Sequence, residues 1–162
     1  MNCFLIRLLC CVCFAHEQLP NYPVVGLGFT IDLAFDAETF SAYALVLSGN
    51  HVFTSGAGGT NAATIRGALR AEREDLLTVV LPQSMDRQAK ESQELLKKVK
   101  DVITMPQNDD KGLDVASRIC NSYLLSQTDQ LISFAFHESN TVIEATKEAK
   151  KLDMLVTVLY LD

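Results

Sequence analysis

The sequence has no tryptophan and only four prolines in 162 residues, and four of its five cysteines lie before residue 14. Since Cys120 is the only cysteine after that point, the main part of the chain cannot be a disulfide framework. The apolar stretch at residues 4–14 is too short to cross a bilayer, and Arg7 interrupts it. These features predict a globular protein of a reducing compartment, with no membrane partner.

Positive charge is also scarce. The chain has 14 Lys and Arg against 20 Asp and Glu, which gives a net charge of -6. This balance opposes a broad surface for polyanions, because non-specific affinity for nucleic acid comes mainly from Lys and Arg. Any contact with nucleic acid must therefore be local. The remaining composition, 48% apolar and 21% charged, is that of one globular domain with one core.

Residues 1–21 differ in composition from the rest of the chain. We interpret them as an N-terminal tail or presequence that precedes a domain of residues 22–162. A cleaved secretory signal, an organelle presequence and a start that is not the native one all explain the change, and secretion is the less favoured reading. Cys3, Cys10, Cys11 and Cys13 are followed by one further candidate ligand, His16, so we expect no metal site.

Strand and helix patterns alternate along the domain. Residues 76–81 read Leu-Leu-Thr-Val-Val-Leu and end at Pro82, which is typical of a central parallel strand. The other expected strands are residues 24–29, 51–55, 102–105, 131–136 and 154–161, and the expected helices lie around residues 40–47, 62–73, 95–99, 113–124 and 143–152. Short connections and right-handed crossovers then predict an α/β fold, in which a single domain holds a doubly wound, mostly parallel sheet.

A glycine-rich loop follows the expected strand at residues 51–55, at the edge of the sheet where ligands bind. Its glycines allow a close backbone approach, and the N-terminus of the next helix attracts negative charge, so the loop is typical of a phosphate site. The predicted ligand-binding residues are Ser55, Gly56, Gly58, Gly59, Thr60, Asn61 and, on the following helix, Arg66. The spacing is neither that of a Walker loop nor a clean G-x-G-x-x-G. The structural alternative is a tight turn capped by Thr60 or Asn61.

Four segments carry a family resemblance: Thr-Ser-Gly-Ala-Gly-Gly-Thr-Asn-Ala-Ala at residues 54–63, Arg66-Gly67-Ala68-Leu69, Val79-Val80-Leu81-Pro82 and Ser117-Arg118-Ile119-Cys120-Asn121. They resemble the core of the DNA recombination-mediator protein A family, also called DNA-processing protein A or Smf. The resemblance implies a Rossmann-like fold, a phosphate or nucleotide pocket and often a homodimer. It adds four residues to the predicted ligand-binding set: Arg118, Asn121, Ser139 and Thr141.

The wider superfamily includes the Lonely Guy phosphoribohydrolases, whose signature Pro-Gly-Gly-x-Gly-Thr-x-x-Glu aligns with residues 136–144. This chain keeps only Thr141 and Glu144 of that signature, and the two residues also fit a helix capping box. Glu144 is the one candidate catalytic residue that the resemblance provides. Family members also commonly carry an arginine after the first strand, where this chain has Gly28-Phe29-Thr30.

We therefore expect the domain to bind a nucleotide or a short single-stranded DNA through the glycine-rich loop, with no metal or other cofactor. One alternative is hydrolysis of a nucleoside monophosphate, with Arg118 and Glu144 taking part. Another is a scaffold that keeps the fold without a ligand. The resemblance favours a plastid or cytoplasmic location.

Overall fold

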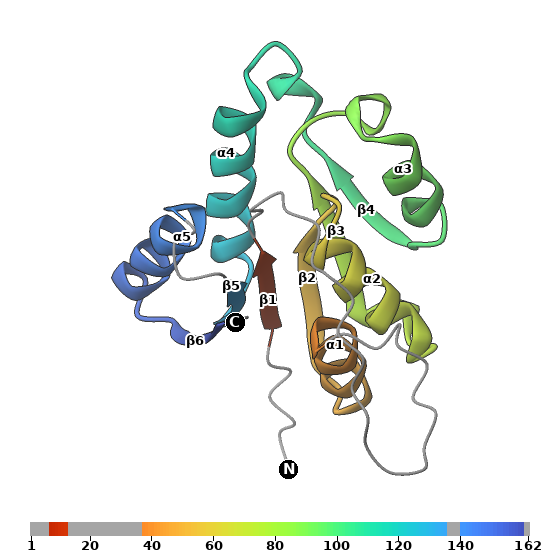
Figure 1. The fold of residues 1–162 in the computed structure, drawn as a ribbon, viewed down its shortest axis with the longest axis vertical. Coiled ribbons are helices and arrows are strands. Elements are labelled where there is room, and N and C mark those ends of the chain that lie inside the picture. Colours follow the sequence, from red (N-terminus) through yellow and green to blue (C-terminus); the bar gives the residue numbers. More distant parts are fainter. Residues whose placement is uncertain (1–6, 13–36, 136–139, 161–162) are drawn as a thin grey trace, which may run out of the picture.

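The structure is a computed structural model that describes residues 7–12, 37–135 and 140–160 (Figure 1). In these residues the strands are β1 (Arg7–Val12), β2 (His51–Ser55), β3 (Leu77–Leu81), β4 (Asp101–Thr104), β5 (Gln130–Ala135) and β6 (Leu155–Tyr160). The helices are α1 (Ala37–Leu47), α2 (Thr60–Arg70), α3 (Lys90–Leu96), α4 (Leu113–Ser126) and α5 (Asn140–Lys151). Three short 3-10 helices are η1 (Glu74–Leu76), η2 (Met85–Arg87) and η3 (Pro106–Asn108).

The strands form one sheet in the order β4-β3-β2-β1-β5-β6, and every neighbouring pair is parallel. From β1 the chain builds outward through β2, β3 and β4, and it then crosses to the other side of β1 for β5 and β6. This reversal next to β1 is the point where doubly wound sheets bind their ligands, beyond the carboxyl ends of the strands. The predicted Rossmann-like α/β fold is confirmed.

Helices pack on both faces of the sheet and make two apolar cores. One core joins α1, α2 and α3 to strand residues such as Val79, and the other joins α4 and α5 to residues such as Val80. Adjacent residues of β3 enter opposite cores because side chains alternate across a strand. Figure 1 shows the same division, with α4 and α5 to the left of the sheet and α1 to α3 to the right. Among the described residues, no helix is both long and apolar enough to span a bilayer.

The strand β1 changes the predicted start of the domain. Residues 7–12 pair with β2 on one side and with β5 on the other, so they supply a central strand of the sheet. The predicted boundary at residue 22 is therefore wrong for this segment. A short apolar run is typical of both a buried parallel strand and the hydrophobic part of a presequence, and composition does not separate the two. The strand predicted at residues 24–29 lies outside the described residues.

Most other predicted elements are present with small shifts. The helix predicted around residues 62–73 ends at Arg70, and the strand predicted from residue 76 begins at Leu77, after η1. The largest shift concerns α3, which runs from Lys90 to Leu96, whereas its apolar residues predicted a helix around 95–99. The first turn of α3 is polar, so hydrophobic periodicity does not detect it.

The helices α1 and α2 approach each other closely at Gly67. A Cβ atom on Gly67 would lie 2.1 Å from the backbone oxygen of Thr39, so only glycine fits there without moving α1. The Thr39 hydroxyl also donates a hydrogen bond to the backbone oxygen of Ala63, at 3.2 Å. These contacts fix α2 against its neighbour, and with it the loop at its N-terminus.

Candidate functional site

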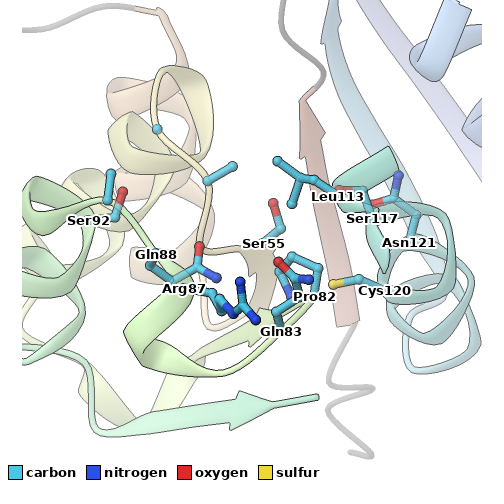
Figure 2. Close-up of a pocket in the computed structure, with 13 residues that line it drawn as sticks. Ser55, Pro82, Gln83, Arg87, Gln88, Ser92, Leu113, Ser117, Cys120 and Asn121 are labelled. Carbon is cyan, nitrogen blue, oxygen red and sulfur yellow. The ribbon is translucent and has the colours of Figure 1, made fainter. Parts of the chain in front are cut away.

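A pocket of about 340 Å³ opens at the carboxyl ends of β2 and β3, against α4 (Figure 2). The residues that line it are Ser55, Ala57, Gly58, Pro82, Gln83, Arg87, Gln88, Ala89, Ser92, Leu113, Ser117, Cys120 and Asn121. Its volume lies within the range of about 300–1,000 Å³ that small-molecule sites occupy. The pocket therefore sits where the topology of the sheet predicts a ligand site.

The glycine-rich loop forms one wall of this pocket through Ser55, Ala57 and Gly58. Gly59 is the N-cap residue of α2, with φ 60° and ψ -130°, a conformation that glycine adopts without strain. Because the N-cap residue is a glycine, no side chain caps the first turn of α2. The alternative in which Thr60 or Asn61 caps the helix is therefore wrong. An uncapped helix N-terminus offers backbone N–H groups and a positive dipole end to an anion.

Other residues of the loop have structural roles. Asn61 is buried, and its Oδ1 accepts a hydrogen bond from the Thr54 hydroxyl at 3.0 Å, which ties the start of α2 to the end of β2. A Cβ atom on Gly56 would lie 2.0 Å from Cδ2 of Leu81, so packing requires a glycine there. Gly56, Gly59, Thr60 and Asn61 are not among the residues that line the pocket. The structure thus retains Ser55 and Gly58 as loop residues of the site.

The arginine at the pocket is Arg87, not Arg66. Arg66 is exposed on α2, more than one turn from the start of the helix, and does not line the pocket. Arg87, at the end of η2, lines the pocket, and its guanidinium makes no hydrogen bond or ion pair with the described residues. It is the one charged residue among the residues that line the pocket in the described part of the chain. A bound anion would therefore find an available guanidinium.

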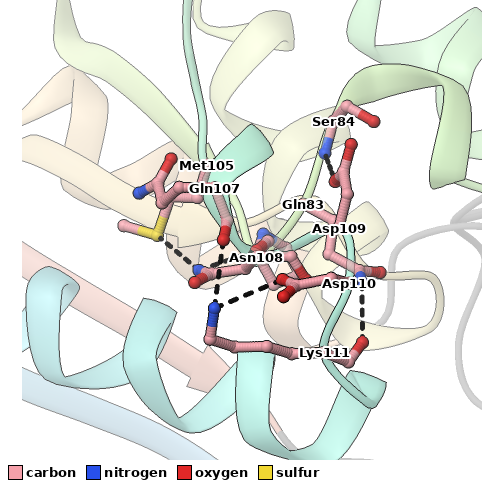
Figure 3. Close-up of polar contacts among 9 residues, drawn as sticks. Gln83, Ser84, Met105, Gln107, Asn108, Asp109, Asp110 and Lys111 are labelled. Carbon is pink, nitrogen blue, oxygen red and sulfur yellow. Dashed lines mark hydrogen bonds and ion pairs between the residues drawn. The ribbon is translucent and has the colours of Figure 1, made fainter.

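The segments that follow β3 and β4 are braced against each other by hydrogen bonds (Figure 3). The Gln83 amide nitrogen donates to the backbone oxygens of Asn108, at 3.0 Å, and Lys111, at 3.1 Å. The Asn108 amide nitrogen donates in return to the backbone oxygen of Pro82 at 3.2 Å. The backbone N–H of Ser84 donates to Oδ1 of Asp109 at 2.8 Å. These bonds give the wall opposite the glycine-rich loop a fixed shape.

The bond between Ser84 and Asp109 makes this wall sensitive to acid. The Ser84 N–H, followed by weaker contributions that include Arg87, lowers the pKa of the Asp109 carboxyl from 3.8. A lowered pKa means that the bond stabilises the fold above pH 3.8 and that this stabilisation is lost as the pH falls through the lowered pKa. We expect the Ser84 amide resonance to titrate with a midpoint below 3.8, and this titration to vanish in Asp109→Asn. A midpoint at or above 3.8 in the unaltered protein would contradict the assignment.

Cys120 forms part of the pocket wall but is not a nucleophile. Its side chain is buried, and its thiol donates to the backbone oxygen of Val80 at 3.4 Å. Burial raises the pKa of the Cys120 thiol from 9.0 to about 12. The thiol is therefore neutral at physiological pH, and only the thiolate attacks electrophiles or binds metals well. Within the described residues, no group of three or more His, Cys, Asp and Glu side chains is placed to hold a metal ion.

The predicted residues of the second half divide between two places. Asn121 lines the pocket, whereas Arg118 forms an ion pair with Glu144 that joins α4 to α5, with 3.3 Å between the Arg118 Nε and the Glu144 Oε2. Both side chains of the pair are more than half exposed, so the pair adds little to stability. Neither of them lines the pocket. They border a separate crevice of about 30 Å³ together with Asn121, Ala145 and Glu148.

The predicted capping box is also different in the structure. The helix α5 begins at Asn140, so Thr141 lies inside the first turn and is not the N-cap residue. Glu144 contacts Arg118 across the two helices. Ser139 and the side chain of Thr141 lie outside the part of the chain that the structure describes, so their predicted contacts to a ligand stay predictions.

Sequence reasoning missed the residues that follow β3 and those at the start of α4: Gln83, Arg87, Gln88, Ser92, Leu113 and Ser117. The sequence does contain a signal for Gln83, the first of these residues. Pro82 ends β3, and β3 pairs with β2 so that Val80 lies beside Ser55. The chain that leaves β3 must therefore pass next to the glycine-rich loop.

No model of a known protein family matches the chain, and no curated protein matches it significantly. The pocket itself is therefore the basis for a functional assignment.

Proposed function

We propose that this protein binds a nucleotide, with the phosphate between the glycine-rich loop, at Ala57 and Gly58, and Arg87. The observation that carries the proposal is that Ala57 and Gly58, just before the N-terminus of α2, and Arg87 border one pocket at the carboxyl edge of the sheet. The backbone N–H groups of a glycine-rich loop that leads into a helix and a guanidinium are both common donors to phosphate in proteins. Since the whole chain has a charge of -6, such a local site is also the way it can attract an anion.

The rest of the pocket suits a sugar and a base. Apolar surface comes from Ala57, Pro82, Ala89 and Leu113, and Leu113 is 63% exposed, at the start of α4. The polar side chains of the lining, apart from Arg87, are serines and amides, which form hydrogen bonds without adding charge. This mixture of apolar surface and a few polar groups is typical of small-molecule sites. Free phosphate alone would leave most of the pocket empty.

The structure favours a mononucleotide over the other functions considered. The family resemblance to recombination-mediator proteins supports a phosphate site and also allows single-stranded DNA. However, Arg87 is the one cation in the described lining, whereas a strand of DNA presents several phosphates. We do not extend the proposal to hydrolysis, because Glu144 pairs with Arg118 and does not line the pocket.

The proposal is tested by calorimetric titration with AMP, GMP, CMP and UMP, each compared with its own nucleoside. At least one monophosphate is expected to bind about tenfold or more tightly than its nucleoside, because the nucleoside lacks the group that meets the glycine-rich loop and Arg87. A short oligodeoxynucleotide serves as a further arm, and steep salt dependence of its binding would indicate a polynucleotide site. Absence of binding by all four monophosphates, or equal affinity for the nucleosides, would refute the proposal.

A further inference from the structure

The Gln83 side chain is held in one orientation at the wall of the pocket. Its amide nitrogen faces two backbone oxygens, those of Asn108 and Lys111, at 3.0 and 3.1 Å. A carbonyl oxygen only accepts hydrogen bonds, so the nitrogen and not the oxygen of the amide must face this pair. Both N–H groups of the amide are used in this way. A rotation that exchanged the two ends of the amide would bring three oxygens together.

The opposite end of this amide is available to a ligand. Gln83 is only 8% exposed, yet its Oε1 has no partner among the described residues and is not sealed from solvent. Since Gln83 lines the pocket, this oxygen opens into it (Figure 2). If a bound ligand left this buried acceptor without a hydrogen-bond donor, the affinity of the ligand would fall. The pocket therefore favours ligands that carry a donor at this point.

We propose that Gln83 makes the pocket specific for nucleotides whose base carries an exocyclic amino group. This inference rests on the proposed nucleotide-binding function and adds to it the class of base. A free glutamine side chain can rotate to meet either an amino group or a carbonyl, but Gln83 cannot, because its nitrogen is bound on the far side. It presents an acceptor only. Adenine and cytosine offer an amino group at the edge where hypoxanthine and uracil offer a carbonyl oxygen.

The ring N–H groups of the carbonyl bases are poorer partners for this acceptor. In hypoxanthine and uracil the ring N–H lies beside one or two carbonyl oxygens, which need donors of their own. Gln83 has no N–H left to supply one. Its Oε1 would also repel the neighbouring carbonyl. An amino group projects from the ring and meets a single acceptor without this conflict.

The test compares two pairs of ligands of nearly equal shape, AMP with IMP and CMP with UMP, on the unaltered protein. In whichever pair binds, we expect the amino member to bind about tenfold or more tightly, since a site with a fixed hydrogen-bond requirement discriminates strongly against a ligand that fails to meet it. Equal affinity within the pair, or preference for IMP or UMP, would overturn the inference and leave the proposed function intact. Absence of binding by all four ligands and by GMP would instead refute the proposed function, and with it the inference.

Two variants assign the selectivity to one side chain. Gln83→Met keeps similar bulk but removes the acceptor, and it is expected to bring the ratio of affinities within the pair close to one. Gln88→Met is the matched control, because Gln88 also lines the pocket but is only partly buried, and its nitrogen lies 3.5 Å from a single backbone oxygen, that of Ser84. The ratio is expected to persist in Gln88→Met. Selectivity that survived in Gln83→Met or vanished in Gln88→Met would show that Gln83 is not its source. If Gln83→Met does not fold, the comparison of the ligand pairs on the unaltered protein still tests the inference.

Discussion

Gly67→Ala is expected to lower the free energy of unfolding by about 1–3 kcal/mol, the usual cost of overpacking. The added Cβ would lie 2.1 Å from the Thr39 backbone oxygen and 2.9 Å from its carbonyl carbon. These are backbone atoms of α1, so a side-chain rotation cannot relieve the contact, and the two helices must separate. Helix propensity acts in the opposite direction, because alanine stabilises a helix by about 1 kcal/mol relative to glycine. A net loss therefore reports the close approach of α1 and α2.

Urea unfolding of the variant measures this loss, and Gly112→Ala provides the matched control. Gly112 precedes α4 with φ -60°, and an added Cβ would meet only Oδ1 of Asp114 closely, at the end of a flexible side chain. We expect its free energy of unfolding to change by less than about 0.5 kcal/mol. If Gly67→Ala were as stable as the unaltered protein or more stable, the packing of α1 on α2 described above would be wrong.

Arg87→Ala is expected to weaken the binding of AMP, or of the monophosphate that binds best, by about 10- to 100-fold. Hydrogen bonds to charged groups contribute about 1.5–3 kcal/mol, and Arg87 is the charged group of the pocket in the described residues. The affinity for the corresponding nucleoside should stay nearly constant, because the guanidinium is expected to contact the phosphate. Calorimetric titration of both ligands separates this effect from general damage to the pocket.

The control for this prediction is Arg66→Ala. Arg66 is the arginine that the sequence itself favours, yet it is exposed on α2 and does not line the pocket. Its replacement should change the affinity less than about twofold, as is usual for a surface substitution away from the ligand. A larger effect of Arg66→Ala than of Arg87→Ala would place the anion on the other side of the loop.

The fold was predictable because its cause is local. The Leu77–Leu81 segment is mostly apolar and is followed by Pro82, and short runs rich in apolar residues also mark β2, β5 and β6. The strand β1 was not predictable in this way. Its position between β2 and β5 depends on pairing with segments far away in the sequence, and the composition of residues 7–12 is equally typical of a presequence.

The site was predictable only on the side that a local motif defines. The glycine-rich loop is recognisable because glycine and a helix start occur together. The roles of Asn61 and Arg66 depend on whether each faces the core or the solvent once α2 packs on the sheet, and the loop motif does not specify this. Gln83 was not predictable, because its role comes from hydrogen bonds to Asn108 and Lys111, more than twenty residues away.

The central claim is that one pocket, between the glycine-rich loop and Arg87, receives a nucleotide. Amide chemical shifts of the isotope-labelled protein, followed during titration with the monophosphate that binds best, test it most directly. We expect the largest changes at Ala57 and Gly58 and at Arg87 and Gln88, on the two walls of the pocket. Saturable changes confined to the crevice of Arg118 and Glu144, or no change at the loop at saturating ligand, would contradict it.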